Sequence, residues 1–329
     1  MTTTQDFQLG MKMESTVGTP VTVDRFLEFK SESLRPDYGV LTSGNRRKGQ
    51  AAVRADRTVR TGLRTLTGGI THDPLSKGWG LIPKLVFGTV STGSPTETTD
   101  YLHTYLITAG NLTGVSATIQ VGRPWMDGTV QPFTYAGCKG GGLTLSTGID
   151  GILESTLSIA HAYSESVSGS VESASYPGGA QVFSYVGGSL LVDTVATPIN
   201  DASVSITNAY AKRPKLGNVA GLEPLENGDR TVTASFTAEF TSMTLLNKVR
   251  SATASGGQAA VVLKWQAPTL LSATLYPYIS ITIPVLEVLG DYVAVAGPDL
   301  ITLPLNGIAR VDGSGVLCIL GYQTTDSTP

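Results

Sequence analysis

Long segments of this chain alternate strictly between apolar and polar side chains, and this alternation constrains the fold more than any other feature. In residues 231–241, the apolar residues from Val232 to Phe240 alternate with Thr, Ser and Glu. The same period of two recurs in 143–149, 153–159, 203–207 and 279–285. In a β-strand this period places the two sets of side chains on opposite faces. The sequence therefore predicts a mainly β protein whose strands have one apolar and one polar face.

Turn and capping residues add detail to this prediction. Asp150-Gly151 separates two alternating segments and is typical of a tight antiparallel hairpin. Residues 74–87 are the one helix candidate, with Asp73 at a capping position, Pro74 in the first turn and Gly88 as a stop. We therefore expect an antiparallel β-sandwich or barrel with one short flanking α-helix.

The distribution of Gly, Pro and Ser predicts the domain organisation. Residues 1–45 contain helix-breaking Gly and Pro and scattered apolar residues, which indicates an extended N-terminal arm. Residues 46–323 form the β domain, and the Ser/Gly-rich stretch near 164–200 is expected to be a loop or insertion. Residues 324–329 are expected to form a flexible C-terminus.

The charge content narrows the class of protein. Only 15% of the 329 residues are charged, against about 25% in a typical soluble domain, and the formal net charge is −3. These values exclude a coiled coil, a globally basic nucleic-acid binder and a charge-rich disordered chain. A chain with so few charges must keep its surface soluble in another way or bury much of it against partners.

We find no sequence signature of catalysis or metal binding. His72, His103 and His161 are isolated, and the Gly140–Gly142 run has no following lysine of a phosphate-binding loop. Cys138 and Cys318 match no metal or redox motif; two free thiols are favoured over a disulfide, which stays open. We therefore expect no enzyme activity, no cofactor and no metal.

No signal peptide or membrane-spanning run is evident, so we expect assembly in the cytoplasm and no membrane partner.

A cluster of basic residues stands out in this acidic chain. Its seven members lie within 19 positions and are Arg46, Arg47, Lys48, Arg54, Arg57, Arg60 and Arg64. An interface with a neighbouring subunit is the favoured interpretation, because such a segment must find its counter-charges somewhere. A solvated face is the second interpretation. Nucleic-acid binding is the third, and the absence of interleaved aromatic residues weighs against it.

The order of several segments resembles the major tail tube proteins of long-tailed bacteriophages, particularly those with flexible, non-contractile tails of the siphovirus type. The segments are Glu14–Pro20, Arg46–Lys48, Phe133–Lys139 leading into 143–163, Gly228–Phe240, Tyr278–Pro284, Pro304-Leu305 and Gly313–Gly315. The resemblance implies a non-enzymatic virion protein that forms rings, usually hexameric, which stack into a hollow tail tube. It also implies contacts with the tape measure, tail terminator and distal tail proteins, and transient passage of double-stranded DNA during ejection into the host.

Under this resemblance we expect the polar strand faces to line the tube. They carry Ser, Thr and Glu but no Lys or Arg, and each Lys/Arg–phosphate contact would slow DNA transit. The candidate lumen-facing residues are Thr144, Ser146, Glu154, Thr156, Ser158, Thr233, Ser235, Thr237 and Glu239. An ordinary solvent-exposed outer face is the alternative. We further expect the helix 74–87 and the basic segment 46–64 to act between subunits and the N-terminal arm to bridge rings.

Other classes of protein share this composition. A tail terminator or head decoration protein is the nearest alternative. A β-rich adhesin or carbohydrate-binding module is less favoured, because the three Trp residues are scattered and no secretion signal is seen.

Overall fold

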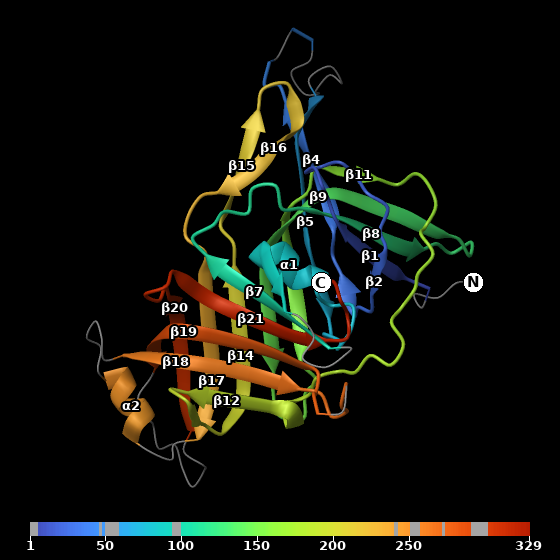
Figure 1. Cartoon of the computed structure of the whole chain (residues 1–329). Coiled ribbons are helices and arrows are strands. Elements are labelled where there is room, and N and C mark those ends of the chain that lie inside the picture. Colours follow the sequence, from blue (N-terminus) through green and yellow to red (C-terminus); the bar gives the residue numbers. More distant parts are fainter. Residues whose placement is uncertain are drawn as a thin grey trace.

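The computed structural model describes residues 6–45, 48–49, 59–93, 100–239, 243–250, 257–271, 274–290 and 302–329. It is mainly β, with antiparallel sheets and little helix, which confirms the predicted fold class (Figure 1). The sheets form a sandwich rather than a closed barrel.

The first layer of the sandwich is built from the segments with the clearest alternation. In spatial order its strands are β5 (Val59–His72), β10 (Glu154–His161), β9 (Val130–Thr147), β14 (Ile199–Thr207), β17 (Thr231–Glu239) and β20 (Thr302–Arg310). The β9–β10 connection contains the predicted Asp150-Gly151 turn, and Asp150 has the positive φ of 59° that such turns require.

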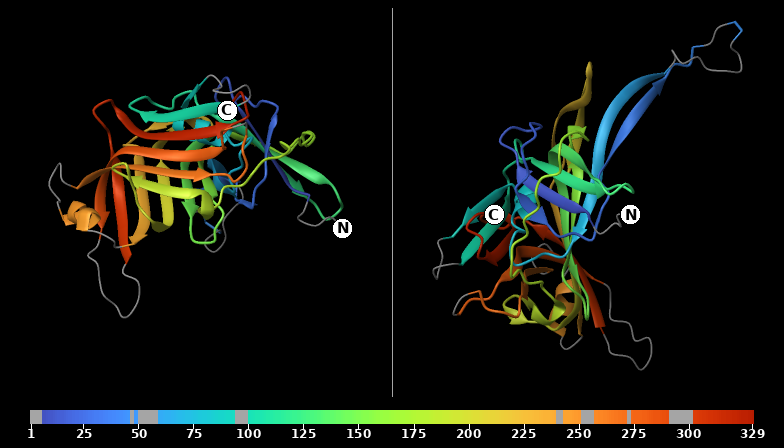
Figure 2. Two further views of the ribbon diagram at one scale, coloured as in Figure 1. Left: turned by 60° about the horizontal axis from the view of Figure 1, so that its bottom comes forward. Right: turned by 90° about the vertical axis from the view of Figure 1, so that its right-hand side faces the viewer.

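The second layer crosses the first, as Figure 1 and the left view of Figure 2 show. In spatial order it contains β6 (Thr89–Thr92), β7 (Tyr101–Thr108), β21 (Val316–Thr324), β19 (Tyr278–Gly290), β18 (Gln258–Gln266), β12 (Gly188–Val192) and β13 (Val195–Ala196). The second half of β19 pairs with β20 and thereby joins the two layers.

The main core lies between these layers. Leu145 and Phe236 point into it from the first layer, and Ile281, Trp265 and Tyr322 from the second; each is at most 2% exposed. Burial of this apolar area is the main favourable term in folding. Most of these inward side chains belong to the apolar set predicted from the alternation, but Ile149, which was counted with that set, is 63% exposed.

The N-terminal region is not the free extended arm that the sequence suggested. A third sheet contains β2 (Arg25–Leu27), β1 (Gln8–Met13), β8 (Ala117–Pro124), the first half of β9 and β11 (Ser164–Ser166). Leu9 and Met11 of β1 are fully buried in the core. The apolar residues of this region, although widely spaced in sequence, supply strands that complete the body of the molecule.

The predicted helix is shorter than expected. α1 spans Leu81–Phe87, begins after Gly80 and ends at Gly88, whose φ of 84° suits a glycine stop. Leu75 instead forms a β-bridge with Val182, which prevents a helix from starting at Pro74. A second helix, α2 (Met243–Arg250), was not predicted.

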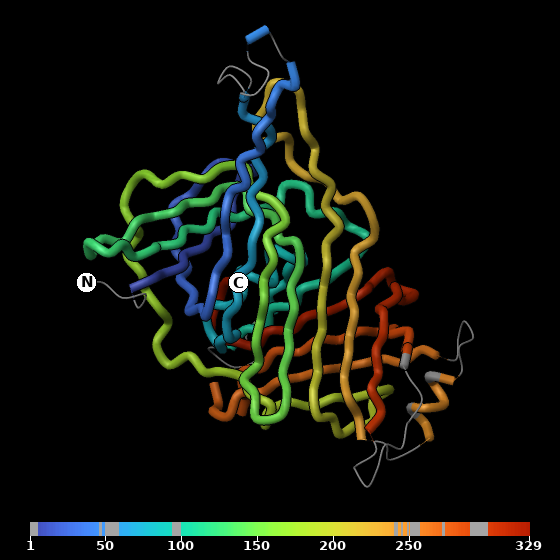
Figure 3. Tube along the Cα trace, turned by 180° about the vertical axis from the view of Figure 1, so that it is seen from behind, coloured from blue at the N-terminus to red at the C-terminus, as the bar shows by residue number. Residues whose placement is uncertain are grey.

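Two hairpins project from the same end of the first layer. One joins β4 (Arg35–Thr42) to β5, with the short β3 (Ser31–Glu32) preceding it; the other joins β15 (Tyr210–Lys215) to β16 (Asn218–Glu226). Figures 2 and 3 show both extending beyond the sandwich. β14 ends at this end of the layer, while the β9–β10 turn lies at the opposite end.

The structure differs in part from the predictions for residues 164–200 and 324–329. In 164–200, residues 167–184 are largely irregular, as expected, but residues 188–200 supply strands to the sandwich. Residues 324–329 lie against the body of the molecule and are held there by hydrogen bonds. The Thr324 hydroxyl donates to the Ser76 carbonyl at 2.7 Å, and Asp326 accepts from the Gly78 amide at 2.6 Å.

Candidate functional surfaces

The outward side chains of four adjacent strands, β10, β9, β14 and β17, form one continuous polar surface, which we call the hydroxyl face. Direct cross-strand partners share a face, and the register aligns Thr156 with Thr144, Thr144 with Ser205, and Ser205 with Thr233. A second row aligns Glu154, Ser146, Ser203 and Ser235. The strands that seemed separate in sequence therefore present their hydroxyl groups side by side.

Hydrogen bonds between strands order part of this face. The Thr144 and Ser205 hydroxyl oxygens lie 3.0 Å apart, and those of Thr71 and Thr156 lie 3.3 Å apart. Asp201 accepts a hydrogen bond from the Thr237 amide at 3.0 Å. The side chains that cover this face are therefore short and partly fixed by hydrogen bonds between strands.

No Lys or Arg occupies an outward position of the described β10, β9, β14 and β17 strands, whereas Glu154, Asp201 and Glu239 do. Lys30 reaches the rim, where its ammonium lies 2.7 Å from Asp73 and 2.9 Å from Glu154. These hydrogen bonds, first to Asp73 and then to Glu154, raise the pKa of Lys30. The four strands therefore carry only acidic charges on this face, and Lys30 at its rim is paired with two carboxylates.

All nine candidate lumen residues lie on the hydroxyl face, and the structure brings them together although they come from three strands. Sequence reasoning did not include Ser203, Ser205 and Thr207 of β14 among the candidates, although their alternation with Val204 and Ile206 was the available signal. Whether this face lines a lumen stays a prediction.

The three described residues of the basic cluster lie on or next to the β4–β5 hairpin. Arg60 and Arg64 lie on β5 and Lys48 lies near the tip, while Arg46, Arg47, Arg54 and Arg57 lie outside the described residues. Arg64 donates to the Tyr163 carbonyl at 2.6 Å. Among the described residues, none of these cations forms an ion pair with a carboxylate.

The same hairpin exposes apolar side chains. Tyr38, Val40 and Leu41 of β4 are each more than half exposed, and Val59 of β5 is 44% exposed. Exposed apolar residues next to unpaired cations are typical of a surface that meets a protein partner. Helix α1 offers no such surface, because Ile82, Leu85 and Val86 are fully buried. The expectation that this helix acts between subunits is therefore wrong.

Glu14, the first residue of the Glu14–Pro20 segment, is buried at the centre of a hydrogen-bond network. One carboxylate oxygen accepts from the Gly18 amide (2.8 Å) and the Ser116 hydroxyl (2.6 Å). The other accepts from the Thr118 hydroxyl (2.7 Å) and the Gly137 amide (2.8 Å). The carboxylate therefore joins β1, β8 and β9, and its role is structural.

A buried ion pair fixes the base of the β15–β16 hairpin. Lys139 of β9 is fully buried, and its ammonium donates to Glu223 of β16 and to the Leu112 carbonyl. Burial alone would raise the pKa of Glu223, but the hydrogen bonds from Lys139 and from the Gly114 amide lower it below its usual value. No sequence pattern pointed to this pair, since its members are far apart along the chain.

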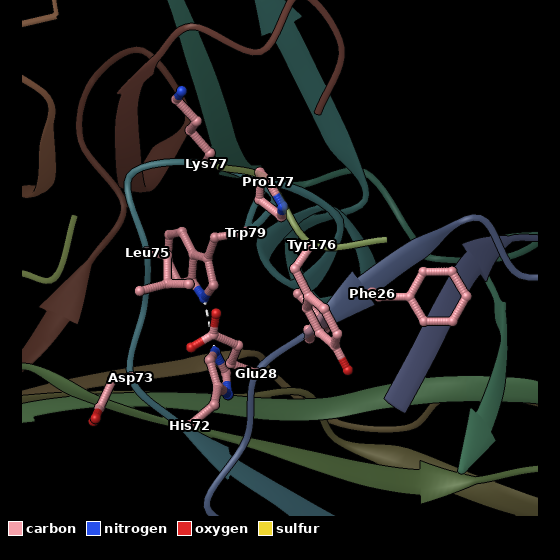
Figure 4. Close-up of a pocket in the computed structure, with 10 residues that line it drawn as sticks. Phe26, Glu28, His72, Asp73, Leu75, Lys77, Trp79, Tyr176 and Pro177 are labelled. Carbon is pink, nitrogen blue, oxygen red and sulfur yellow. Dashed lines mark hydrogen bonds between the residues drawn. The ribbon is translucent and has the colours of Figure 1, made fainter. Parts of the chain in front are cut away.

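The three histidines and two cysteines are buried structural residues. His72 accepts a hydrogen bond of 2.9 Å from the Trp79 indole, beside a hollow of about 290 Å³ (Figure 4). Burial lowers the pKa of His72 to about 3 and also lowers the pKa of His103 and His161. Cys138 and Cys318 are free and fully buried, and burial raises the pKa of Cys318 to about 12.

The described residues contain neither a metal-ligand cluster nor a membrane-spanning helix. No three His, Cys, Asp or Glu side chains gather there as metal ligands. None of the helices in the described part of the chain has the length and apolar character needed to cross a bilayer.

These observations place the chain in a class of β-sandwich proteins with one broad, hydroxyl-bearing sheet face and projecting hairpins. The family model described as phage tail tube protein matches residues 4–309. The chain therefore belongs to the phage tail tube protein family and is a structural component of the virion tail. A comparison with curated proteins gave no match.

Proposed function

We propose that this protein forms the tail tube of a siphovirus-type bacteriophage, as rings, most simply hexamers, that assemble in the host cytoplasm and stack into a conduit for DNA. The observation that carries the proposal is the hydroxyl face, four strands wide and without Lys or Arg. Hydroxyl groups keep such a wall wetted, and its few carboxylates repel the phosphates of a passing duplex. We propose a conduit and no catalytic role.

The width of the face fits this role. If six subunits each contribute four strands spaced ~4.8 Å apart and tilted by ~45°, the backbone diameter is roughly 50 Å. Side chains narrow the bore, but Ser and Thr are short, so a duplex about 20 Å wide still passes. The tape measure protein occupies the same bore before ejection, and the tail terminator and distal tail proteins bind the tube ends.

The β4–β5 hairpin supplies a subunit interface in this proposal. Charge reversal of Arg54 and Arg57 (R54E/R57E) is expected to block tube formation while the monomer stays folded, and R54K/R57K is the matched control. Electron microscopy of the purified proteins reads the result. Tubes of normal yield from R54E/R57E would contradict the interface role.

DNA transit tests the conduit itself. Thr233 is exposed on β17, the outermost of the four strands of the hydroxyl face, so Thr233→Lys adds a cation to this face without breaking an ion pair. Glu154→Lys would also disrupt the contact with Lys30. Virions with Thr233→Lys are expected to assemble but to release DNA several-fold more slowly, as are those with Glu239→Lys. Thr233→Gln is the control of similar size. Unchanged release kinetics with correct tubes would place this face away from the lumen.

A further inference from the structure

A hollow opens at the end of the sandwich where the β9–β10 turn lies, and nothing in the described chain fills it. It is lined by Thr147, Tyr185, Ile199 and Asp201, above a floor formed by Leu263 and Trp265. Leu263 and Trp265 are each 1% exposed and belong to the packed core, so the floor is rigid and apolar.

The rim of this hollow is also apolar and carries negative charge. Ile149 of the β9–β10 turn is 63% exposed and Val186 is 77% exposed. The two segments lie together, because the Tyr185 amide donates to the Gly151 carbonyl at 3.0 Å. Asp150 and Asp201 are exposed beside them. Such a rim fits a segment in which an apolar side chain lies next to a positively charged one.

The β15–β16 hairpin presents that combination at the opposite end of the molecule. β14 begins at Ile199, beside the hollow, and ends at Thr207, from which this hairpin continues. Leu216 at its tip is fully exposed. Lys212, Arg213 and Lys215 are exposed on β15, and no ion pair neutralises them within the described residues.

We propose that the tip of the β15–β16 hairpin docks into this hollow of a second copy of the chain, with Leu216 against the apolar floor and Lys215 facing Asp201. The proposal rests on the proposed function, because it names the contact by which copies stack. The hairpin tip and the hollow lie at opposite ends of one chain, so the contact between two copies is head to tail. Such a contact can repeat from copy to copy without forming a closed ring, as the stacking of a tube requires. The buried Lys139–Glu223 pair holds the base of the hairpin in place for docking.

Disulfide trapping tests the contact directly. The variant L216C/S189C places one thiol at the tip and one on the exposed residue Ser189 that lines the hollow. Cys138 and Cys318 are fully buried and do not interfere. Oxidised tubes are expected to give a ladder of cross-linked multimers on a denaturing gel without reductant. The control L216C/V167C, with Val167 exposed on a loop elsewhere, is expected to give none.

A charged tip gives an independent readout. Leu216→Asp is expected to reduce the yield of sedimentable tubes at least tenfold while thermal unfolding of the monomer is unchanged, and Val167→Asp is expected to leave the yield unaltered. Normal tubes from Leu216→Asp, or normal tubes of L216C/S189C without a ladder, would overturn the contact and leave the proposed function standing. Failure of the unmutated protein to form any tube would instead contradict the proposed function, and this contact with it.

Discussion

At the scale of single residues, the buried carboxylate of Glu14 shows how one side chain stabilises the junction of three strands. Its two oxygens accept four hydrogen bonds, from Gly18, Ser116, Thr118 and Gly137. Hydrogen bonds to a charged acceptor are stronger than neutral ones, and a buried donor that loses its acceptor keeps its full desolvation cost. The junction therefore depends on a charge that the sequence pattern did not reveal.

We predict that Glu14→Ala lowers the free energy of unfolding by about 3–5 kcal/mol, because four donors lose their acceptor at once. Urea denaturation of the monomer measures the change. Met126→Ala, at a position that is 94% exposed, is the control and is expected to stay within about 0.5 kcal/mol of the unmutated protein. A loss below about 1 kcal/mol for Glu14→Ala would contradict the network.

The buried histidines predict how stability depends on pH. In the unfolded chain they titrate near a pKa of about 6.5, but burial lowers the pKa of His72 to about 3 in the folded protein. As the pH falls below 6.5 the unfolded state therefore binds protons that the folded state does not, and stability is lost. The stability is fully present above pH 6.5. Carboxylates whose pKa is lowered in the folded protein, such as Glu223, reduce its stability only below about pH 4.5, where the unfolded chain begins to bind protons.

The substitution His72→Gln tests this dependence, since glutamine offers Trp79 an acceptor and does not titrate. Between pH 7 and pH 5 the variant is expected to lose about 2 kcal/mol less stability than the unmutated protein. Urea denaturation at the two pH values measures the difference. An equal loss in both proteins would mean that His72 is not held neutral in the fold.

At the scale of elements, the Lys139–Glu223 pair anchors the β15–β16 hairpin, together with hydrogen bonds from the Gly114 amide to Glu223 and from the Leu112 amide to Glu226. Glu223→Gln leaves a fully buried ammonium without its counter-charge, which is expected to cost about 3 kcal/mol. Hydrogen exchange is expected to rise in Tyr210–Glu226 more than in β17. The double variant K139M/E223L removes both charges and is the control. If it is as destabilised as Glu223→Gln, the cost does not come from the unpaired charge.

The elements also show how far the sequence could predict the structure. The alternation in Thr231–Glu239 and Glu154–His161 predicted strands and the correct buried face, because side-chain period is a local property. It could not predict that β14 lies between β9 and β17, because strand order depends on contacts between distant segments. The lumen candidates were therefore found as separate stripes, and only the register joined them into one face.

Where local signals competed, tertiary contacts decided the outcome. Asp73 and Pro74 predicted a helix start, but the bridge between Leu75 and Val182 holds that segment extended. The scattered apolar residues of the N-terminal region indicated an extended arm, whereas Leu9 and Met11 are part of the core. The Lys139–Glu223 contact joins residues 84 positions apart and has no local signature.

At the scale of the whole molecule, the low charge content finds a physical explanation in the distribution of polar groups. The hydroxyl face is polar without cations, and exposed apolar side chains occur both on the projecting hairpins, such as Leu41 and Leu216, and at the opposite end of the sandwich, such as Ile149. Protein interfaces are depleted in charge at their centres. In the proposed function, the subunit would meet copies of itself at both ends and offer its sheet to DNA, and such a subunit needs few charges anywhere.

The most direct test of this account is a cryo-electron microscopy reconstruction of tubes formed by the purified protein. We predict stacked rings whose bore is lined by the outward side chains of β9, β10, β14 and β17, including Thr144, Ser205 and Thr233. Tubes in which these hydroxyl groups face the outside or are buried between subunits would contradict the account, as would a protein that forms only monomers or closed cages.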